Sequence, residues 1–155
     1  MTASGVGDER TLLLGTLGFL RDAVLRKVTG ITEEQARWRP DGRLISLVGI
    51  VHHLSCVERR WIDGAFLGAD VERSEEEFVA PGMTLDDAVA AYRARAAATD
   101  AVVLATPSLD VRGRGTPVGV DRDLRFILLH VIQETARHAG HADATREMLD
   151  GTTGW

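Results

Sequence analysis

The side chains best suited to bind a metal ion lie in two short segments of the sequence. The first segment holds two adjacent histidines, His52 and His53. The second holds three histidines and a glutamate: His130, Glu134, His138 and His141. At about 100° per residue, these four positions fall within one stripe of a helix. Imidazole and carboxylate groups gathered on one side of a helix predict a site for a divalent metal ion.

The pair formed by Glu134 and His138 carries most of this prediction. Residues four apart on a helix project toward one point, and the apolar residues around this pair place it beside the buried face. A buried carboxylate without a partner is costly, and a metal ion would remove that cost. A third ligand must then come from a facing helix. His52 and His53 point about 100° apart, so only one of them can supply it, and periodicity alone leaves that choice open.

Four amphipathic segments must form the helices that position these residues. Each begins at a side chain that can cap a helix, namely Asp8, Ser46, Thr84 and either Asp121 or Asp123. The predicted helices span residues 8–30, 46–66, 84–104 and 124–149, and a short helical turn opens at Thr32 and ends at Pro40. No strand pattern competes with them. Four such helices predict a single all-α domain over residues 1–155, a four-helix bundle.

The links between these helices are long. Residues 68–81 are acidic and aperiodic, so we expect an exposed connection there. Residues 107–120 are rich in glycine and should form a loop. Links of this length allow a connectivity other than simple up-and-down. Trp38, Trp61 and Phe126 are expected in the core or along the wall of a pocket.

The composition excludes several classes of function. The 155 residues carry a formal net charge of -5 with both signs interspersed, so nucleic acid is not an expected partner. Cys56 is the only cysteine, which excludes an internal disulfide, and we expect it to be a small core thiol. Residues 1–5 lack the pattern of a secretory signal, and no stretch approaches the roughly 20 apolar residues of a membrane span. We therefore expect a cytoplasmic protein without a membrane partner.

Two motifs in the chain resemble those of a known superfamily. The sequence from Ser46 to Leu54, followed by Val57-Glu58-Arg59-Arg60-Trp61, is similar to the second-helix motif of the DinB superfamily. Residues 134–143 resemble its fourth-helix motif, and the closing residues 150–155 fit it too. The resemblance covers essentially the whole chain and points to the DUF664-type branch. It implies a bundle of DinB type.

The resemblance also implies a particular set of metal ligands. Many members of the superfamily bind zinc or nickel through three histidines, whereas Glu134 here stands in place of one of them. The mycothiol-dependent maleylpyruvate isomerases of the same superfamily use a His/Glu/His set. That similarity favours His53 over His52 and maps Glu134 and His138 as its partners. It implies zinc as the metal, with nickel as the alternative.

The function implied by the resemblance is thiol transfer. The superfamily includes S-transferases that use bacillithiol or mycothiol. Lys27 is the only lysine of a chain rich in arginine, which is typical of a GC-rich genome and suits mycothiol better. We therefore expect a metal-dependent S-transferase in which a thiolate held at the metal attacks an electrophilic small molecule.

Two other hypotheses remain open at this stage. Hydrolysis by metal-bound hydroxide would need a group to transfer protons, and only His130 and His141, expected beside the ligands, could serve. The third hypothesis is a metal-binding protein without catalysis. The remaining apolar surface of the bundle could support a homodimer in either case.

Overall fold

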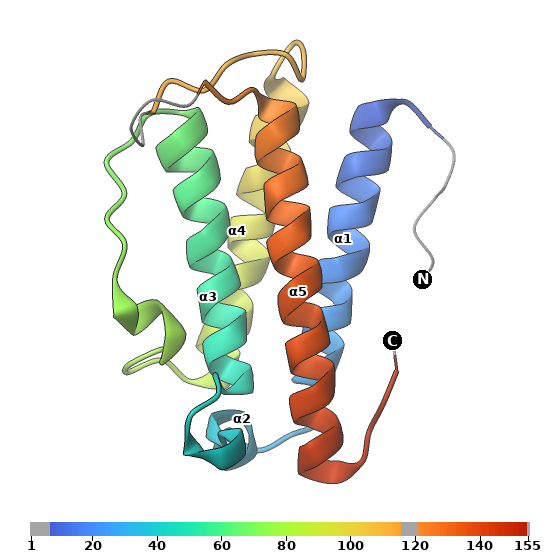
Figure 1. Cartoon of the computed structure of the whole chain (residues 1–155), viewed down its shortest axis with the longest axis vertical. Helices are drawn as coiled ribbons and strands as arrows, with labels where there is room; N and C mark the ends of the chain where they lie inside the picture. The colour runs from blue at the N-terminus through green and yellow to red at the C-terminus, as the bar shows by residue number, and fades with distance from the viewer. Residues whose placement is uncertain (1–6, 116–120, 155) are drawn as a thin grey trace.

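Helices dominate this computed structural model, which describes residues 7–115 and 121–154. In that part of the chain the long helices are α1 (Glu9–Lys27), α3 (Leu47–Arg59), α4 (Leu85–Ala105) and α5 (Leu124–Asp150). They pack side by side as a bundle (Figure 1). Among the described residues, β-type pairing is limited to the isolated bridge between Arg112 and Asp123. The prediction of an all-α four-helix bundle is confirmed.

Parts of three predictions lie outside the described residues. These are the absence of a secretory signal in residues 1–5, the contribution of residues 116–120 to the 107–120 loop, and the closing Trp155.

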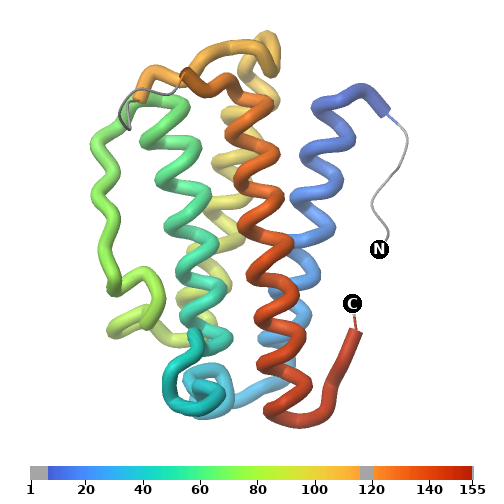
Figure 2. Tube along the Cα trace, in the orientation of Figure 1, coloured from blue at the N-terminus to red at the C-terminus, as the bar shows by residue number. Residues whose placement is uncertain are grey.

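The helices do not alternate simply in direction. α1 and α5 run one way along the bundle, whereas α3 and α4 both run the other way (Figures 1 and 2). Two parallel neighbours need a crossover, and residues 67–84 provide it by returning along the outside of α3 (Figure 2). α5 packs against both α1 and α3, while α3 also packs against α4. The long links predicted from the sequence are what make this connectivity feasible.

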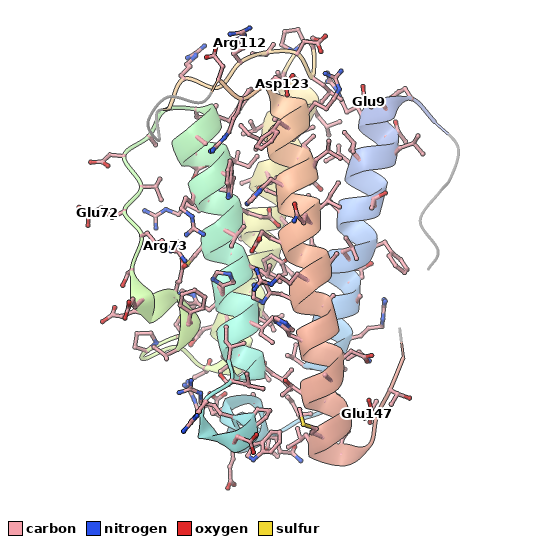
Figure 3. The ribbon with its side chains drawn as sticks, in the orientation of Figure 1. Glu9, Glu72, Arg73, Arg112, Asp123 and Glu147 are labelled. Atoms are coloured by element: carbon pink, nitrogen blue, oxygen red, sulfur yellow. The ribbon has the colours of Figure 1, made fainter. Side chains whose placement is uncertain are left out.

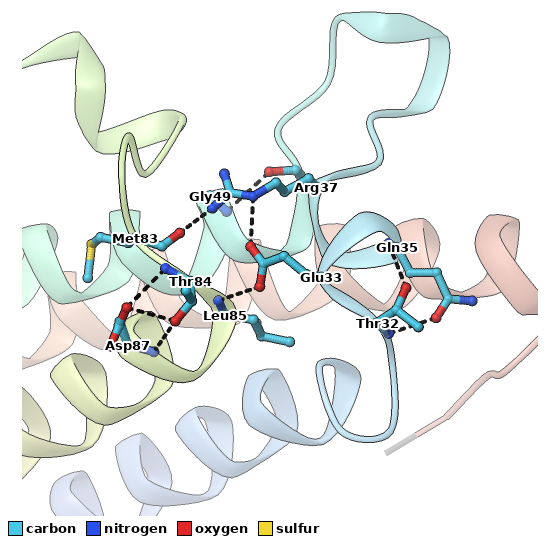
Figure 4. Close-up of polar contacts among 10 residues, drawn as sticks. Thr32, Glu33, Gln35, Arg37, Gly49, Met83, Thr84, Leu85 and Asp87 are labelled. Carbon is cyan, nitrogen blue, oxygen red and sulfur yellow. Dashed lines mark hydrogen bonds and ion pairs between the residues drawn. The ribbon is translucent and has the colours of Figure 1, made fainter.

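Local signals determine where the helices begin. A backbone N–H of the first turn donates to a capping side chain in each long helix, namely Asp8, Ser46, Thr84 and Asp123. The short helix α2 (Glu33–Arg37) starts with a capping box between Thr32 and Gln35. Its Glu33 accepts a hydrogen bond of 2.7 Å from the Leu85 N–H, so α2 holds the first turn of α4 (Figure 4). No helix in the described ranges combines the length and apolarity needed to cross a membrane.

The helix predicted over residues 46–66 reaches Phe66 but changes its winding on the way. Beyond Arg59 the chain forms a π-helix, η2 (Arg60–Phe66). The Leu67 N–H donates to the Ile62 carbonyl five residues back, at 2.9 Å. The expectation of one regular helix is therefore corrected over its last turns. Wide turns of this kind are rare and often occur at functional sites.

A polar layer separates two apolar clusters inside the bundle. One cluster contains Leu47, Ile50, Leu54 and Tyr92, and the other contains Ile62, Phe66, Leu124 and Leu128. Between them, the buried Arg21 of α1 donates two hydrogen bonds, of 2.8 and 2.7 Å, to Glu58 of α3. A third, of 2.8 Å, goes to Asp100 of α4. Breaking such a buried pair costs about 3–5 kcal/mol, so this layer fixes the three helices relative to one another.

Candidate metal centre

The predicted ligands meet between α3 and α5. His53 comes from α3, and Glu134 and His138 come from successive turns of α5. Each offers one ligand atom, and these three atoms all lie within 4.8 Å of one another. His138 Nε2 is 3.8 Å from Glu134 Oε2, and the rings of His53 and His138 meet edge to face with centroids 4.6 Å apart. The structure thus brings together the three residues that the sequence singled out.

Burial differs among the three side chains. His53 and His138 are 4% and 7% exposed, whereas the Glu134 side chain keeps 21% of its surface exposed. The cluster is therefore covered on the histidine side and reaches solvent at the carboxylate. A site with three protein ligands and one accessible side has the form of a catalytic metal site more than of a sealed structural one.

The neighbouring histidine points elsewhere. His52 is half-buried, and its Nε2 lies 3.7 Å from the thiol of Cys56, one turn further along α3. Both residues line a separate surface pocket beneath residues 71–83. Of the two histidines between which periodicity left the choice open, His53 is the one that lies next to Glu134 and His138. Cys56 is half-buried instead of fully buried, and burial raises the pKa of its thiol.

Glu77 lies beside the site, although nothing in the sequence singles it out. It lies in the 3₁₀-helix η3 (Glu75–Phe78) within the crossover, and it is 4% exposed. Its Oε1 is 3.5 Å from His53 Nδ1, and its Oε2 accepts a hydrogen bond of 2.7 Å from Arg60. Arg73 approaches the same carboxylate at 3.4 Å. His53 Nδ1 and Glu77 Oε1 form no hydrogen bond at this distance, but Glu77 stands where a carboxylate could orient the ring of a metal-binding histidine.

The prediction that residues 68–81 form an exposed connection holds for most of the segment. Glu72 projects outward, and Arg73, which is also exposed, lies on the side toward α3 (Figure 3). Glu77 and Ala80 are buried. A run of acidic residues resembles a solvated link in sequence, and only the contact with α3 distinguishes the one glutamate that turns inward.

Gly49 allows the crossover to pack closely on α3. It lies one turn before His53 on α3, and a Cβ built there would be 2.4 Å from the Phe78 carbonyl oxygen. Any other residue at this position would push η3 outward. With glycine, the Phe78 ring stacks on His53 at 4.5 Å between centroids, next to Glu77. A glycine inside a strongly apolar helix was the one sequence signal that a backbone comes close here.

Both histidines of the cluster are held in the neutral form. Burial, followed by the neighbouring His138, lowers the pKa of His53 to about 4 despite the opposing influence of Glu77. Burial is also the largest cause of the lowered pKa of His138, followed by His141. Neutral imidazole is the form that binds metal. Nδ1 of both histidines is moreover buried without a hydrogen-bond partner among the described residues. Two neutral imidazoles and one carboxylate are a donor set that fits a divalent ion.

The two remaining histidines lie beside the cluster and are not part of it. His141 is exposed, and its ring meets His138 edge to face at 5.3 Å. His130, one turn before Glu134, packs on Trp61 with ring centroids 4.0 Å apart. Trp61 lines a pocket, as predicted. Trp38 and Phe126 are 39% and 47% exposed, so the expectation that they lie in the core is wrong.

Comparison with known proteins now identifies the family. The model of the mycothiol-S-transferase family matches residues 12–151. The chain belongs to this family. The resemblance to the DinB superfamily, drawn from the motifs on α3 and α5, is thereby confirmed.

A solved structure supports the fold of this mycothiol-S-transferase family member. It is the crystal structure of "the conserved protein of locus from Enterococcus faecalis", with a TM-score of 0.70 and 16% sequence identity. The match covers 95% of this chain and 100% of that one. At this identity the likeness concerns the fold alone. A search of curated proteins finds no significant match.

Proposed function

We propose that this protein is a metal-dependent S-transferase that joins mycothiol to an electrophilic small molecule. The observation that carries the proposal is the convergence of His53, Glu134 and His138 in a chain of the mycothiol-S-transferase family. Zinc is the metal that a His/Glu/His set with a free fourth position suits best, and nickel is the alternative.

The metal would be held by two neutral histidines and one carboxylate. When bound, such an ion supplies Lewis acidity, which favours the thiolate form of a thiol at neutral pH. Glu134 lowers the net charge of the centre compared with a third histidine, so that a thiolate there keeps more of its electron density. Glu77 would accept a hydrogen bond from His53 Nδ1, which leaves Nε2 of that ring for the metal.

The reaction forms one carbon–sulfur bond. The thiol gives up its proton, the sulfur attacks the electrophilic carbon, and the bond to the leaving group breaks with its electron pair. His130 is a candidate base beside the cluster, because it stands one turn from Glu134, packs on Trp61 and has a pKa that burial lowers. It would accept the proton released from sulfur and pass it to solvent.

A thiol-consumption assay tests this proposal. Purified protein loaded with zinc or nickel is incubated with monobromobimane and a panel of thiols comprising mycothiol, bacillithiol, glutathione and cysteine. We expect consumption of mycothiol well above the uncatalysed rate, lost after chelation and in His138→Ala. His130→Ala should keep the metal but react more slowly. Equal rates with and without protein for every thiol would overturn the proposal.

The two rival functions predict different results in the same experiment. A hydrolase would leave the thiols intact but release product from an activated ester in a metal-dependent way. A purely structural metal site would show neither activity. The exposed edge of Glu134 supports an enzyme, because a structural site gains nothing from access to solvent.

A further inference from the structure

A cavity of about 580 Å³ lies beside the metal centre, where the end of α3 meets the link between α4 and α5. Its volume is in the range of pockets that hold small molecules. Four arginines line it, together with one aspartate and one tryptophan: Arg60, Arg73, Arg114, Arg122, Asp70 and Trp61. An excess of guanidinium groups in one concave site is typical of anion recognition.

The π-helix and Gly115 build this cavity. The carbonyls at the end of η2 have no partner within the helix, and the link supplies their donors: Arg114 N–H to Phe66 at 2.9 Å and Gly115 N–H to Ala65 at 3.1 Å. A Cβ at Gly115 would lie 1.9 Å from the Gly64 carbonyl oxygen. The link can therefore pack on η2 only because residue 115 is glycine, and this packing delivers Arg114 to the cavity.

The arginines differ in how far their charge is already neutralised. Arg60 and Arg73 share the carboxylate of Glu77. Among the described residues, Arg114 and Arg122 have no carboxylate partner. Arg122 lies over the Trp61 ring at 4.7 Å, and its Nε is buried without a hydrogen-bond partner in the same part of the chain. Arg122 is thus held in the pocket wall with a buried donor to spare, and the exposed Arg114 adds a second guanidinium group at the same pocket.

Two residues of the cavity wall also contact groups beside the proposed reaction site. Trp61 lines the cavity and packs on His130, which precedes Glu134 by one turn of α5. On the other side, Arg60 lines the cavity and bonds Glu77, the carboxylate behind His53. The apolar part of the wall, which includes Ala65 and Val71, suits a hydrocarbon body.

We propose that this arginine pocket binds the carboxylate of the electrophilic substrate, so that Arg114 and Arg122 select small acids with an apolar body. Calling the bound acid a substrate rests on the proposed transferase function. Binding of the acid itself requires neither catalysis nor metal. A carboxylate between the two guanidinium groups would satisfy the unused donors, and the apolar body would point along Trp61 toward the metal centre.

Titration with benzoate tests the pocket directly. Binding is followed by calorimetry and by two-dimensional NMR of the full chain, with benzamide as the uncharged counterpart. We expect benzoate to bind at least about 10-fold more tightly than benzamide, and Arg122→Gln and Arg114→Gln each to weaken benzoate by about 10-fold, the loss of one charge-assisted pair. Arg43→Gln removes the same charge at the opposite end of α3 and should leave binding unchanged.

Further measurements distinguish binding in this pocket from binding at the metal centre. His138→Ala should bind benzoate as the wild type does, whether or not the transferase assay succeeds. Affinity lost in His138→Ala but kept in Arg122→Gln would place the carboxylate on the metal and overturn the inference. The inference would also be overturned if benzamide bound as tightly as benzoate or if benzoate showed no saturable binding. Tighter binding of phenylphosphonate than of benzoate would overturn it as well, because it would assign the pocket to phosphate groups. A melting curve for each variant verifies that it is folded.

Discussion

Glu134 distinguishes this centre from one built of three histidines. As a carboxylate it would add a negative charge to a bound metal centre. Glu134→Gln keeps the shape and removes that charge, so we expect zinc affinity to fall by roughly 10- to 100-fold, as is typical when a metal site is altered. Glu134→His supplies a third imidazole and should retain the metal. Competition titration with a chromogenic chelator measures both affinities.

Comparing Glu134→Gln with Glu134→His tests whether Glu134 is a metal ligand. If Glu134→His lost the metal while Glu134→Gln bound it as well as the wild type, the carboxylate would not be a ligand. The transferase proposal would then lose the residue on which its charge argument depends.

His53 should make the metal-free protein sensitive to mild acid. Its pKa is lowered to about 4, mainly by burial, with His138, Glu77, Arg60 and Arg73 as the charged groups around it. In the unfolded chain its pKa is about 6.5. Between these values the unfolded state binds more protons, so the free energy of unfolding should fall as the pH drops from about 6.5 toward 4 and should not change through this group above 6.5.

Urea unfolding of metal-free protein at a series of pH values measures this effect. One pKa unit corresponds to about 1.4 kcal/mol. His53→Gln removes the titrating group and should flatten the dependence, whatever its effect on absolute stability. An unchanged slope in His53→Gln would mean that other groups cause the acid sensitivity.

The clustering of the three candidate ligands could be predicted from sequence because its signal is local. One turn of helix joins Glu134 to His138, and a second apolar helix with adjacent histidines limits the third ligand to two candidates. Glu77 could not be predicted, because nothing within the acidic run distinguishes it from Glu75 or Glu76. Its role depends on a contact with α3 that only the folded chain creates.

At the scale of elements, the close packing of η3 on α3 should depend on Gly49. Gly49→Ala would set a methyl group 2.4 Å from the Phe78 carbonyl oxygen, and the backbone there cannot rotate away. We expect a loss of about 1–3 kcal/mol in stability, typical of overpacking. Because η3 carries Glu77, zinc affinity should fall as well. Thermal unfolding and chelator competition measure the two effects.

Gly15→Ala is the matched control for this variant. Gly15 also lies within a helix, α1, but a Cβ there meets nothing within 4 Å. The same change should therefore raise stability by up to about 1 kcal/mol, because alanine has the higher helix propensity. If Gly49→Ala were as stable as Gly15→Ala and bound zinc normally, η3 would not be held in the way described.

The helices were predictable as elements for a related reason. Their caps are local sequence signals, and Asp8, Ser46, Thr84 and Asp123 all cap as expected. The π-helix at the end of α3 was not foreseen. Its carbonyls are satisfied by N–H groups of residues 114 and 115, distant in sequence, and a local pattern contains no information about that contact.

In the molecule as a whole, the parallel arrangement of α3 and α4 explains why the crossover, residues 67–84, covers one side of the site. The crossover needed to make them parallel must return along the bundle, and it does so over the His53 face of α3 (Figure 2). The sequence predicted that the links were long enough for this topology. It could not predict the path, which depends on the fit of Phe78 against Gly49.

Metal binding should stabilise the folded bundle as a unit, because its ligands come from two helices, α3 and α5, and are assembled only in the folded chain. The bound ion therefore links folding to metal concentration. We expect about one divalent ion per chain and a melting temperature that rises with free zinc, by a stabilisation of about 2.7 kcal/mol when zinc is at 100 times its dissociation constant. Elemental analysis and thermal unfolding in metal buffers give these two quantities.

His138→Ala should lose both the ion and the dependence on zinc, whereas His130→Ala, which alters a ring packed on Trp61 outside the cluster, should keep both. The same metal content and zinc dependence in His138→Ala as in the wild type would show that zinc stabilises the protein from a different site.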